Sequence, residues 1–278
     1  MAHGELNQYY KNAMKFLVFG DVVGSIGRSA VGAVLPSLRE EFAPDAVIVN
    51  VENIAHGKGI SPETMQEAFK WNVLAFTTGD HAWDNAQGID ILNSPSVPIV
   101  RPANYPGNAP GRGYVVVQAG AYEVAVINLQ GQVMFKNQPN NPFYVLDEIL
   151  SKPEVARAAI KLVDFHAEAT SEKRGLGWHA DGRISAMWGT HTHVPTADAQ
   201  ILPKGTGYIT DVGMNGAYDS LIGMEPKAPL KQFLTQLRVK MEPPETGRQE
   251  VNAVFLDIDP STGKTTAIAQ IRRILQND

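Results

Sequence analysis

The chain has 278 residues, with 24 Lys and Arg against 29 Asp and Glu, which gives a formal net charge of −5. A mildly acidic chain is poorly suited to general nucleic-acid binding, because phosphates need a basic face. Cysteine is absent, which excludes disulfides, thiolate metal sites and cysteine nucleophiles, and no run of 18 apolar residues predicts a membrane span.

The first 13 residues are polar and lack the apolar stretch of a signal peptide. We expect residues 1–13 to be a disordered extension or a cloning remnant, and residues 14–278 to form a single domain. The lack of cysteine also suits a reducing compartment, and we expect a cytoplasmic protein.

The first part of the chain alternates between strand and helix patterns. Continuous apolar runs predict buried strands at residues 15–20, 45–51 and 73–78. A short fourth strand is predicted at residues 98–101. A helix is predicted from about Ser25 to Phe42, and Ser61 and Pro62 are typical of the N-cap and first residue of another. Strand–helix–strand repeats of this kind predict a parallel sheet with right-handed crossovers.

The second part of the chain has a different pattern. A hairpin is predicted at residues 114–118 and 123–129, and a closing hairpin at residues 252–259 and 265–272. Between them we expect a helix from Asn141-Pro142 to about Leu150. Two further strands are expected at residues 159–165 and 184–189, with a glycine-rich surface loop between them at residues 175–181. These elements predict one α/β domain with a central sheet, parallel at first and mixed later, and helices on both faces.

Five of the predicted strands end in polar residues that can bind metal. The residues concerned are Asp21, Glu52, Asn53, Asp80, His81, His166, His191 and His193. Ligands of α/β sheets bind at the carboxyl ends of the strands, where parallel neighbours bring such side chains to one edge. His191 and His193 lie two residues apart, so in an extended segment both point to the same face.

Each of these residues alone has an ordinary structural explanation. An aspartate after a strand is usually a turn residue, and a lone histidine such as His166 is more often hydrogen-bonded in the core. Their coincidence at strand ends, in a chain without cysteine, favours a site for one or two borderline divalent metals. Rival motifs fail, since Gly20, Gly24 and Gly27 lack the dinucleotide-binding spacing and no G-x-S-x-G elbow occurs.

The order of these segments resembles the calcineurin-like metallophosphoesterases, and more narrowly their bacterial YmdB-like subfamily. The resemblance covers nearly the whole chain from Met14. Its segments here read GDVVGSIGR, VENIAHGKG, GDHAWD, RPANYP, DFHAEATSEK, GTHTHVPTAD and ITDVGMNGAYDS. It implies a layered fold with central mixed sheets flanked by helices, and a metal site at the carboxyl ends of the strands.

The resemblance also implies a role for each site residue. Asp21, Asn53 and His193 would bind a first metal, and Glu52 would bridge both metals. Asp80, His166 and His191 would bind the second metal, and His81 would donate a proton. Position 80 is a departure, because the family has asparagine where this chain has Asp80.

We therefore expect a dinuclear metal-dependent phosphodiesterase acting on cyclic nucleotides, with 2′,3′-cyclic nucleotides favoured. A metal-bridged hydroxide would attack phosphorus and His81 would protonate the leaving oxygen. Iron or manganese is favoured, with zinc or magnesium as alternatives. The expected partner is a small phosphodiester substrate. We expect no binding to membranes, and the sequence leaves open whether the chain forms a homo-oligomer. Two alternatives remain: a phosphomonoesterase on the same metals, and a metal-binding regulatory protein with weakened catalysis.

Overall fold

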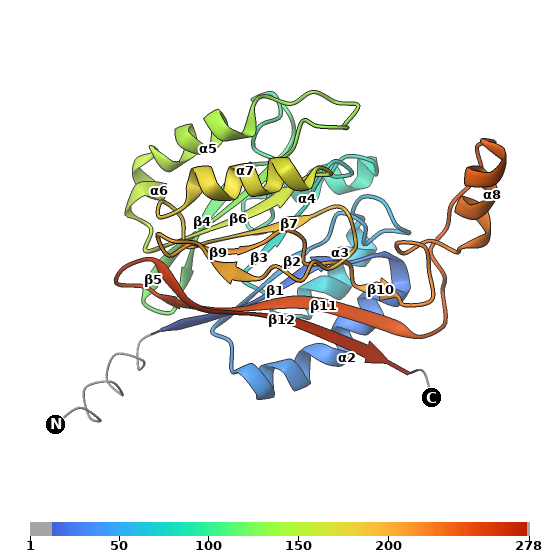
Figure 1. Ribbon diagram of the computed structural model, residues 1–278, viewed down its shortest axis with the longest axis horizontal. Helices are drawn as coiled ribbons and strands as arrows, with labels where there is room; N and C mark the ends of the chain where they lie inside the picture. The colour runs from blue at the N-terminus through green and yellow to red at the C-terminus, as the bar shows by residue number, and fades with distance from the viewer. Residues whose placement is uncertain (1–12, 277–278) are drawn as a thin grey trace.

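The computed structural model describes residues 13–276. The predicted extension at residues 1–13 therefore lies outside the described residues, except for Ala13. Two six-stranded sheets pack face to face, and helices cover their outer faces (Figure 1). Among residues 13–276, no helix has the length and apolar character needed to cross a bilayer.

The first sheet has the strand order β10-β11-β1-β2-β3, with β12 paired to β11. Its strands are β1 (Met14–Asp21), β2 (Ala46–Asn50), β3 (Ala75–Thr77), β10 (Gly216–Ala217), β11 (Gln249–Asp259) and β12 (Lys264–Leu275). The strands β1, β2 and β3 run parallel, whereas β11 runs antiparallel to β1. The carboxyl ends of three successive parallel strands thus meet at one edge.

The second sheet has the strand order β4-β5-β6-β7-β9-β8. Its strands are β4 (Tyr114–Ala119), β5 (Tyr122–Gln130), β6 (Ile160–His166), β7 (Ala186–Thr190), β8 (Gln200–Ile201) and β9 (Gly207–Ile209). The strands β5, β6, β7 and β9 are parallel, and the edge strands β4 and β8 are antiparallel to their neighbours.

The helices divide between the two outer faces. Alongside the first sheet lie α2 (Gly24–Phe42), α3 (Pro62–Phe69), the short 3-10 helix η2 (Ala86–Gly88) and α4 (Ile89–Asn93). The second sheet is covered by α5 (Pro142–Leu150), α6 (Pro153–Arg157) and α7 (Thr170–Ala180). One further helix of the described residues, α8 (Lys227–Thr235), projects away from the body of the molecule (Figure 1).

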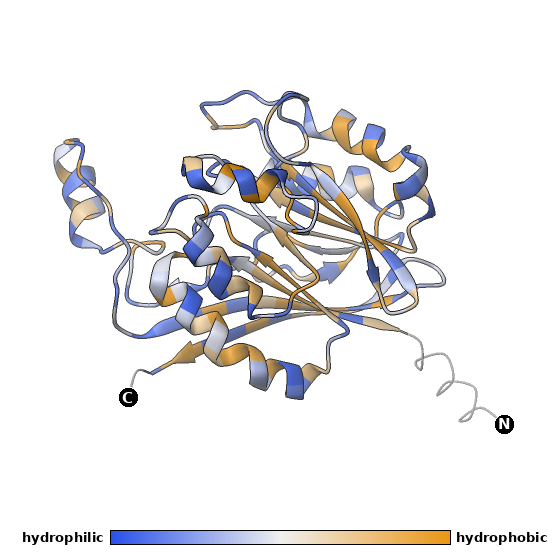
Figure 2. Ribbon diagram, turned by 180° about the vertical axis from the view of Figure 1, so that it is seen from behind, coloured by the Kyte–Doolittle hydropathy of each residue, from blue (hydrophilic) through white to orange (hydrophobic). Residues whose placement is uncertain are grey.

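An apolar layer fills the space between the two sheets. It contains alternate residues of the facing strands, among them Phe16, Val18, Ile48, Val126 and Leu162, as the two-residue period of a strand requires. The apolar strand cores appear as orange ribbons in Figure 2. Toward the carboxyl ends of the strands this layer becomes polar, although it stays buried, at Asn50, Thr77, Asn128 and Asp164.

The predicted fold class is confirmed, with three local differences. The chain forms two sheets, because β5 pairs with β6 and not with the first sheet. Residues 98–101 form only a single bridge, between Ile99 and Phe76. Residues 170–180 form α7, where a glycine-rich loop is predicted at residues 175–181. Packing overrides helix propensity there, since a Cβ at Gly177 would lie 2.7 Å from the Tyr208 ring.

The predicted start of α3 is confirmed and can be tested by substitution. Thr64 donates its backbone N–H to the Ser61 hydroxyl, and Ser61 donates its own N–H to the Thr64 hydroxyl. We expect Ser61→Ala to lower the free energy of unfolding by about 1 kcal/mol, because one N–H loses its cap. Urea unfolding measures the change, and Ser171→Ala at an exposed position of α7 is the matched control. Equal stability of both variants would contradict the capping role.

Candidate metal centre

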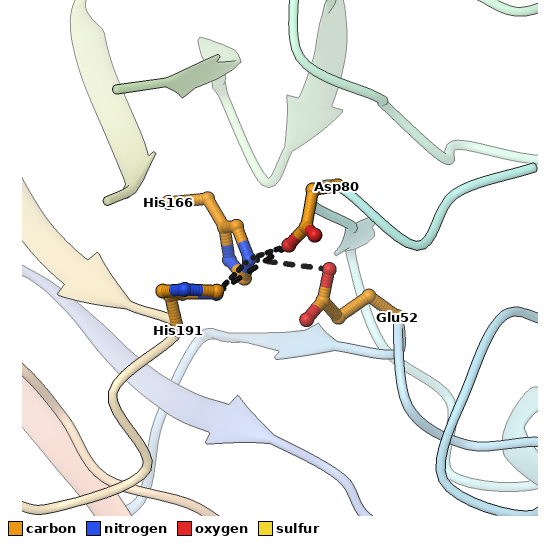
Figure 3. Close-up of side chains that lie close together, drawn as sticks. All are labelled: Glu52, Asp80, His166 and His191. Atoms are coloured by element: carbon orange, nitrogen blue, oxygen red, sulfur yellow. Dashed lines mark hydrogen bonds and ion pairs between the residues drawn. The ribbon is translucent and has the colours of Figure 1, made fainter. Parts of the chain in front are cut away.

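The predicted site residues meet at the shared edge of the two sheets. Two groups of side chains lie close enough to hold an ion each, and Glu52 belongs to both. One group is Glu52, Asp80, His166 and His191, and the other is Asp21, Glu52 and His193. The first sheet supplies all the carboxylates, and the second sheet supplies all three histidines. Figure 3 shows the larger group, with its side chains pointing toward one another.

The larger group is centred on the buried His166 ring. Its Nε2 atom lies 3.0 Å from Asp80 Oδ1 and 3.3 Å from Glu52 Oε2. The Nδ1 atom of His191 lies 3.0 Å from the same His166 nitrogen. Four potential ligand atoms from the ends of four strands thus lie close together, which fits a single ion.

The hydrogen bonds behind His166 determine which of its nitrogens carries the proton. Asp164 accepts the Thr190 hydroxyl proton at 2.7 Å, so Thr190 Oγ1 can only accept from His166 Nδ1, at 2.9 Å. Burial lowers the pKa of His166 to about 3, so the ring is neutral. The Nε2 lone pair therefore faces the carboxylates of Asp80 and Glu52, an arrangement that a cation would stabilise.

The other two histidines are also oriented by contacts behind them. His193 Nδ1 lies 2.8 Å from the carbonyl oxygen of Ile222 and must donate to it, which leaves Nε2 free as a ligand. His191 Nε2 lies 3.2 Å from a Glu168 carboxylate oxygen, which leaves Nδ1 for the site. Both histidines have positive φ angles, 97° for His191 and 64° for His193, a strained conformation for residues other than glycine.

Crowded carboxylates dominate the electrostatics. Burial and the nearby Asp211 raise the pKa of Asp21 to about 7. Burial, with Asp80 and Asp21 nearby, raises the pKa of Glu52 well above its usual range. Burial acts in the same direction on Asp80, but the neighbouring His166 and His191 rings outweigh it and lower its pKa. Carboxylates that share a buried site in this way favour either protons or divalent cations.

Two buried oxygen atoms support the binding of divalent cations. Asp21 Oδ1 and Asn53 Oδ1 have no hydrogen-bond partner among the described residues. The Asn53 amide nitrogen donates to the carbonyl oxygen of Gly57 at 3.0 Å, which orients its oxygen. An unpartnered buried oxygen costs free energy unless a ligand satisfies it. The residues therefore fit a pair of metal ions held by oxygen and imidazole ligands.

His81 lies beside this cluster rather than in it. Its Nδ1 atom is 2.8 Å from Asp84 Oδ2, and its Nε2 atom is 3.9 Å from Asp80 Oδ2. Since Nδ1 faces a carboxylate, the ring is oriented with Nε2 toward the centre. The side chain is 24% exposed, so His81 can reach both solvent and a bound molecule.

Several contributors escape prediction from the sequence. Asp164 accepts hydrogen bonds from Thr77, Thr190 and Asn50, and so joins both sheets beneath His166. Glu168 supports His191. The only available signal is that Asp164 precedes His166 by two residues on the same strand, which places both on one face.

Comparison with known proteins identifies the family. A sequence model of the YmdB-like proteins matches residues 17–271. The chain belongs to the YmdB-like family. The 2′,3′-cyclic-nucleotide 2′-phosphodiesterase of Bacillus subtilis is 46% identical to it, over 95% of this chain and 98% of that protein.

Two solved structures of similar proteins have the same fold. A crystal structure of a phosphatase from Mycoplasma pneumoniae superposes with a TM-score of 0.89 at 35% identity, covering 96% of this chain and 95% of that one. A hypothetical protein from Thermus thermophilus gives 0.87 at 39% identity, covering 94% and 99%. The family and the layered metallophosphoesterase-like fold expected for this chain are thus confirmed.

Gly79 tests how tightly the centre is packed. A Cβ at this position would lie 2.2 Å from Glu52 Oε2 and 2.4 Å from His166 Nε2. We expect Gly79→Ala to separate these two ligands, weaken metal affinity at least about tenfold and cost about 1–3 kcal/mol of stability. Metal titration and urea unfolding measure the two effects. Gly107→Ala, where a Cβ meets nothing within 4 Å, is the control; wild-type metal affinity in Gly79→Ala would contradict the assignment.

The raised pKa of Asp21, about 7, predicts a pH-dependent effect in metal-free protein. Because the folded-state pKa is raised, the stability that it contributes is present below about pH 4 and is lost as pH rises through about 7. Asp21→Asn should therefore gain stability relative to wild type across this range, and saturating Mn²⁺ should reverse the order. Urea unfolding with chelator measures this, with Asp90→Asn on α4 as control. Parallel pH curves for wild type and Asp21→Asn would refute it.

Proposed function

We propose that this protein is a phosphodiesterase that hydrolyses 2′,3′-cyclic nucleotides at a dinuclear metal centre. The observation that carries the proposal is the pair of ligand groups that share Glu52, in a chain whose Bacillus subtilis relative is named for this reaction. Its place in the cytoplasm and its small phosphodiester partner are parts of the same proposal.

In this proposal the two groups of side chains hold two divalent or transition-metal ions, with iron or manganese favoured over zinc or magnesium. Asp21, Asn53 and His193 hold one ion, and Glu52 is shared. The ligands of the other ion are Asp80, His166 and His191. When bound, such a pair of ions polarises the phosphoryl oxygens and lowers the pKa of water toward neutrality.

The leaving sugar oxygen needs a proton, which we assign to His81. Asp84 holds the ring through Nδ1, so a protonated His81 presents its Nε2–H toward the centre. General acid catalysis of this kind contributes roughly 10²–10⁴-fold. The contact with Asp84 fixes the direction of the ring.

Two measurements test the proposed function. Protein purified without chelators should contain about two equivalents of metal and hydrolyse 2′,3′-cyclic nucleotides faster than nucleoside monophosphates. Faster turnover of mono- than of bis-(p-nitrophenyl) phosphate would favour the phosphomonoesterase alternative. Two bound ions without turnover, across a panel of metals, would favour the regulatory protein.

His81→Ala tests the proton donor. We expect the variant to keep both ions but to lose roughly 10²–10⁴-fold in kcat on cyclic nucleotides, whose leaving group needs protonation. The loss should be far smaller on bis(p-nitrophenyl) phosphate, because p-nitrophenolate leaves without a proton. Comparing kcat on the two substrates, with metal content measured in parallel, checks the prediction.

The exposed His56 offers a matched control, because it lies in the loop after β2 and is not part of either ligand group. His56→Ala should behave like wild type on both substrates. Equal losses on both substrates in His81→Ala would mean that His81 positions the phosphate or a metal ion and does not supply the proton.

A further inference from the structure

A fully buried ion pair lies directly beneath the turn that carries two of the histidines. Lys173 on α7 and Asp211, which follows β9, are both 0% exposed, and their Nζ and Oδ2 atoms are 2.6 Å apart. Neither residue belongs to the two ligand groups. No part of the proposed chemistry uses them, although each lies in a segment that the family resemblance singles out.

Asp211 is bonded to the turn itself. Its Oδ2 atom accepts the Thr192 hydroxyl proton at 2.7 Å and the Thr192 backbone N–H at 3.3 Å. Its Oδ1 atom accepts the backbone N–H of Gly213 at 2.8 Å. Oδ2 therefore accepts three hydrogen bonds, one of them from the Lys173 ammonium group. Thr192 lies between His191 and His193, so Asp211 grips the centre of the turn.

The turn needs such a contact because its backbone is strained. Both flanking histidines have positive φ angles, and conformations of this kind persist only where the surroundings impose them. Lys173 reaches Asp211 past Gly189 on β7, where a Cβ would lie 2.9 Å from the Lys173 Cδ atom. A Cβ there would also lie 1.8 Å from the Thr210 carbonyl oxygen, so both the β7–β9 packing and the Lys173 side chain require glycine at this position.

A buried ion pair is not in itself a device for stability. Well-packed apolar residues of similar volume are often equal or better, because both charges must be desolvated. The position of the pair, and not its energy, is therefore the informative feature. Asp211 lies near Asp21, in a region already rich in carboxylates, and Lys173 compensates part of its negative charge.

We propose that Lys173 and Asp211 are positioning residues that hold the His191–His193 turn in the conformation required to bind metal. This inference rests on the proposed metal centre. It assigns the ion pair to the geometry of the ligands and not to the overall stability of the fold.

The test uses metal-free full-length protein titrated with Mn²⁺. Asp211→Asn should weaken Mn²⁺ affinity about 10–100-fold, as loss of the residues that orient metal ligands does elsewhere. Thr192→Val, which removes only the hydroxyl donor, should weaken it about fivefold. Lys161→Met is the matched control, because Lys161 is a half-buried lysine of β6 that bonds to the Ala158 carbonyl oxygen, away from the site.

A double variant separates positioning from stability. Lys173→Met/Asp211→Leu removes both charges together, so no buried charge is left unpaired. The donors of Thr192 and Gly213 lose their acceptor, and the melting temperature should fall only as far as the loss of these hydrogen bonds requires. Its Mn²⁺ affinity should remain weak, and the spin-coupled signal of paired Mn²⁺ ions should be lost. In metal-free protein, the amide of Thr192 should exchange with solvent faster in the variant than in wild type. This measurement does not depend on metal binding.

The outcomes are distinguishable. If wild type binds two ions and the double variant binds them equally well, the pair is only structural and the inference is wrong, while the proposed function stands. The same holds if Asp211→Asn and Thr192→Val lose melting temperature without losing affinity. If wild type binds no Mn²⁺ and hydrolyses no phosphodiester, the proposed function fails and the inference fails with it.

Discussion

The mutual repulsion of buried carboxylates is the constraint on which the rest of this structure depends. Asp21 and Glu52 lie almost fully out of solvent at the edge where two sheets meet, and burial raises the pKa of both. Such a cluster persists only where cations or protons balance it. The oriented lone pairs of His166 and His193 favour cations, because an unprotonated ring nitrogen cannot donate a hydrogen bond to a carboxylate. The surrounding fold consequently serves to hold charge in place.

The fold meets this constraint through a gradient between its two sheets. The inter-sheet layer is apolar over most of its length, at residues such as Phe16 and Leu162. It becomes polar toward the carboxyl ends of the strands, where Asp164 is bonded to Asn50 on the first sheet and Thr190 on the second. A hydrogen-bonded layer of this kind is directional. It fixes the register of one sheet against the other beneath the ligands, which apolar packing alone does less strictly.

Much of this arrangement follows from the sequence. Continuous apolar runs that end in Asp21, Glu52 or His166 identify parallel strands, and parallel strands bring their ends together. The second sheet and α7 do not follow, because strand pairing and packing against Tyr208 are long-range choices that local pattern does not encode. The proton position on His166 depends on Thr190, 24 residues away. The pairing of Lys173 with Asp211 is equally invisible, since a lysine in a polar segment is ordinarily a solvated one.

The division of ligands between the sheets has a further consequence. Oxygen ligands come from the first 80 residues and nitrogen ligands from the stretch between His166 and His193, so neither half of the chain carries a mixed set. An ion in this centre would link two layers that are otherwise joined by apolar packing and by hydrogen bonds such as those of Asp164. Its affinity would then report how well the halves are aligned. Molecules whose two sheets are correctly aligned would bind metal, and molecules whose sheets are shifted relative to each other would bind it more weakly.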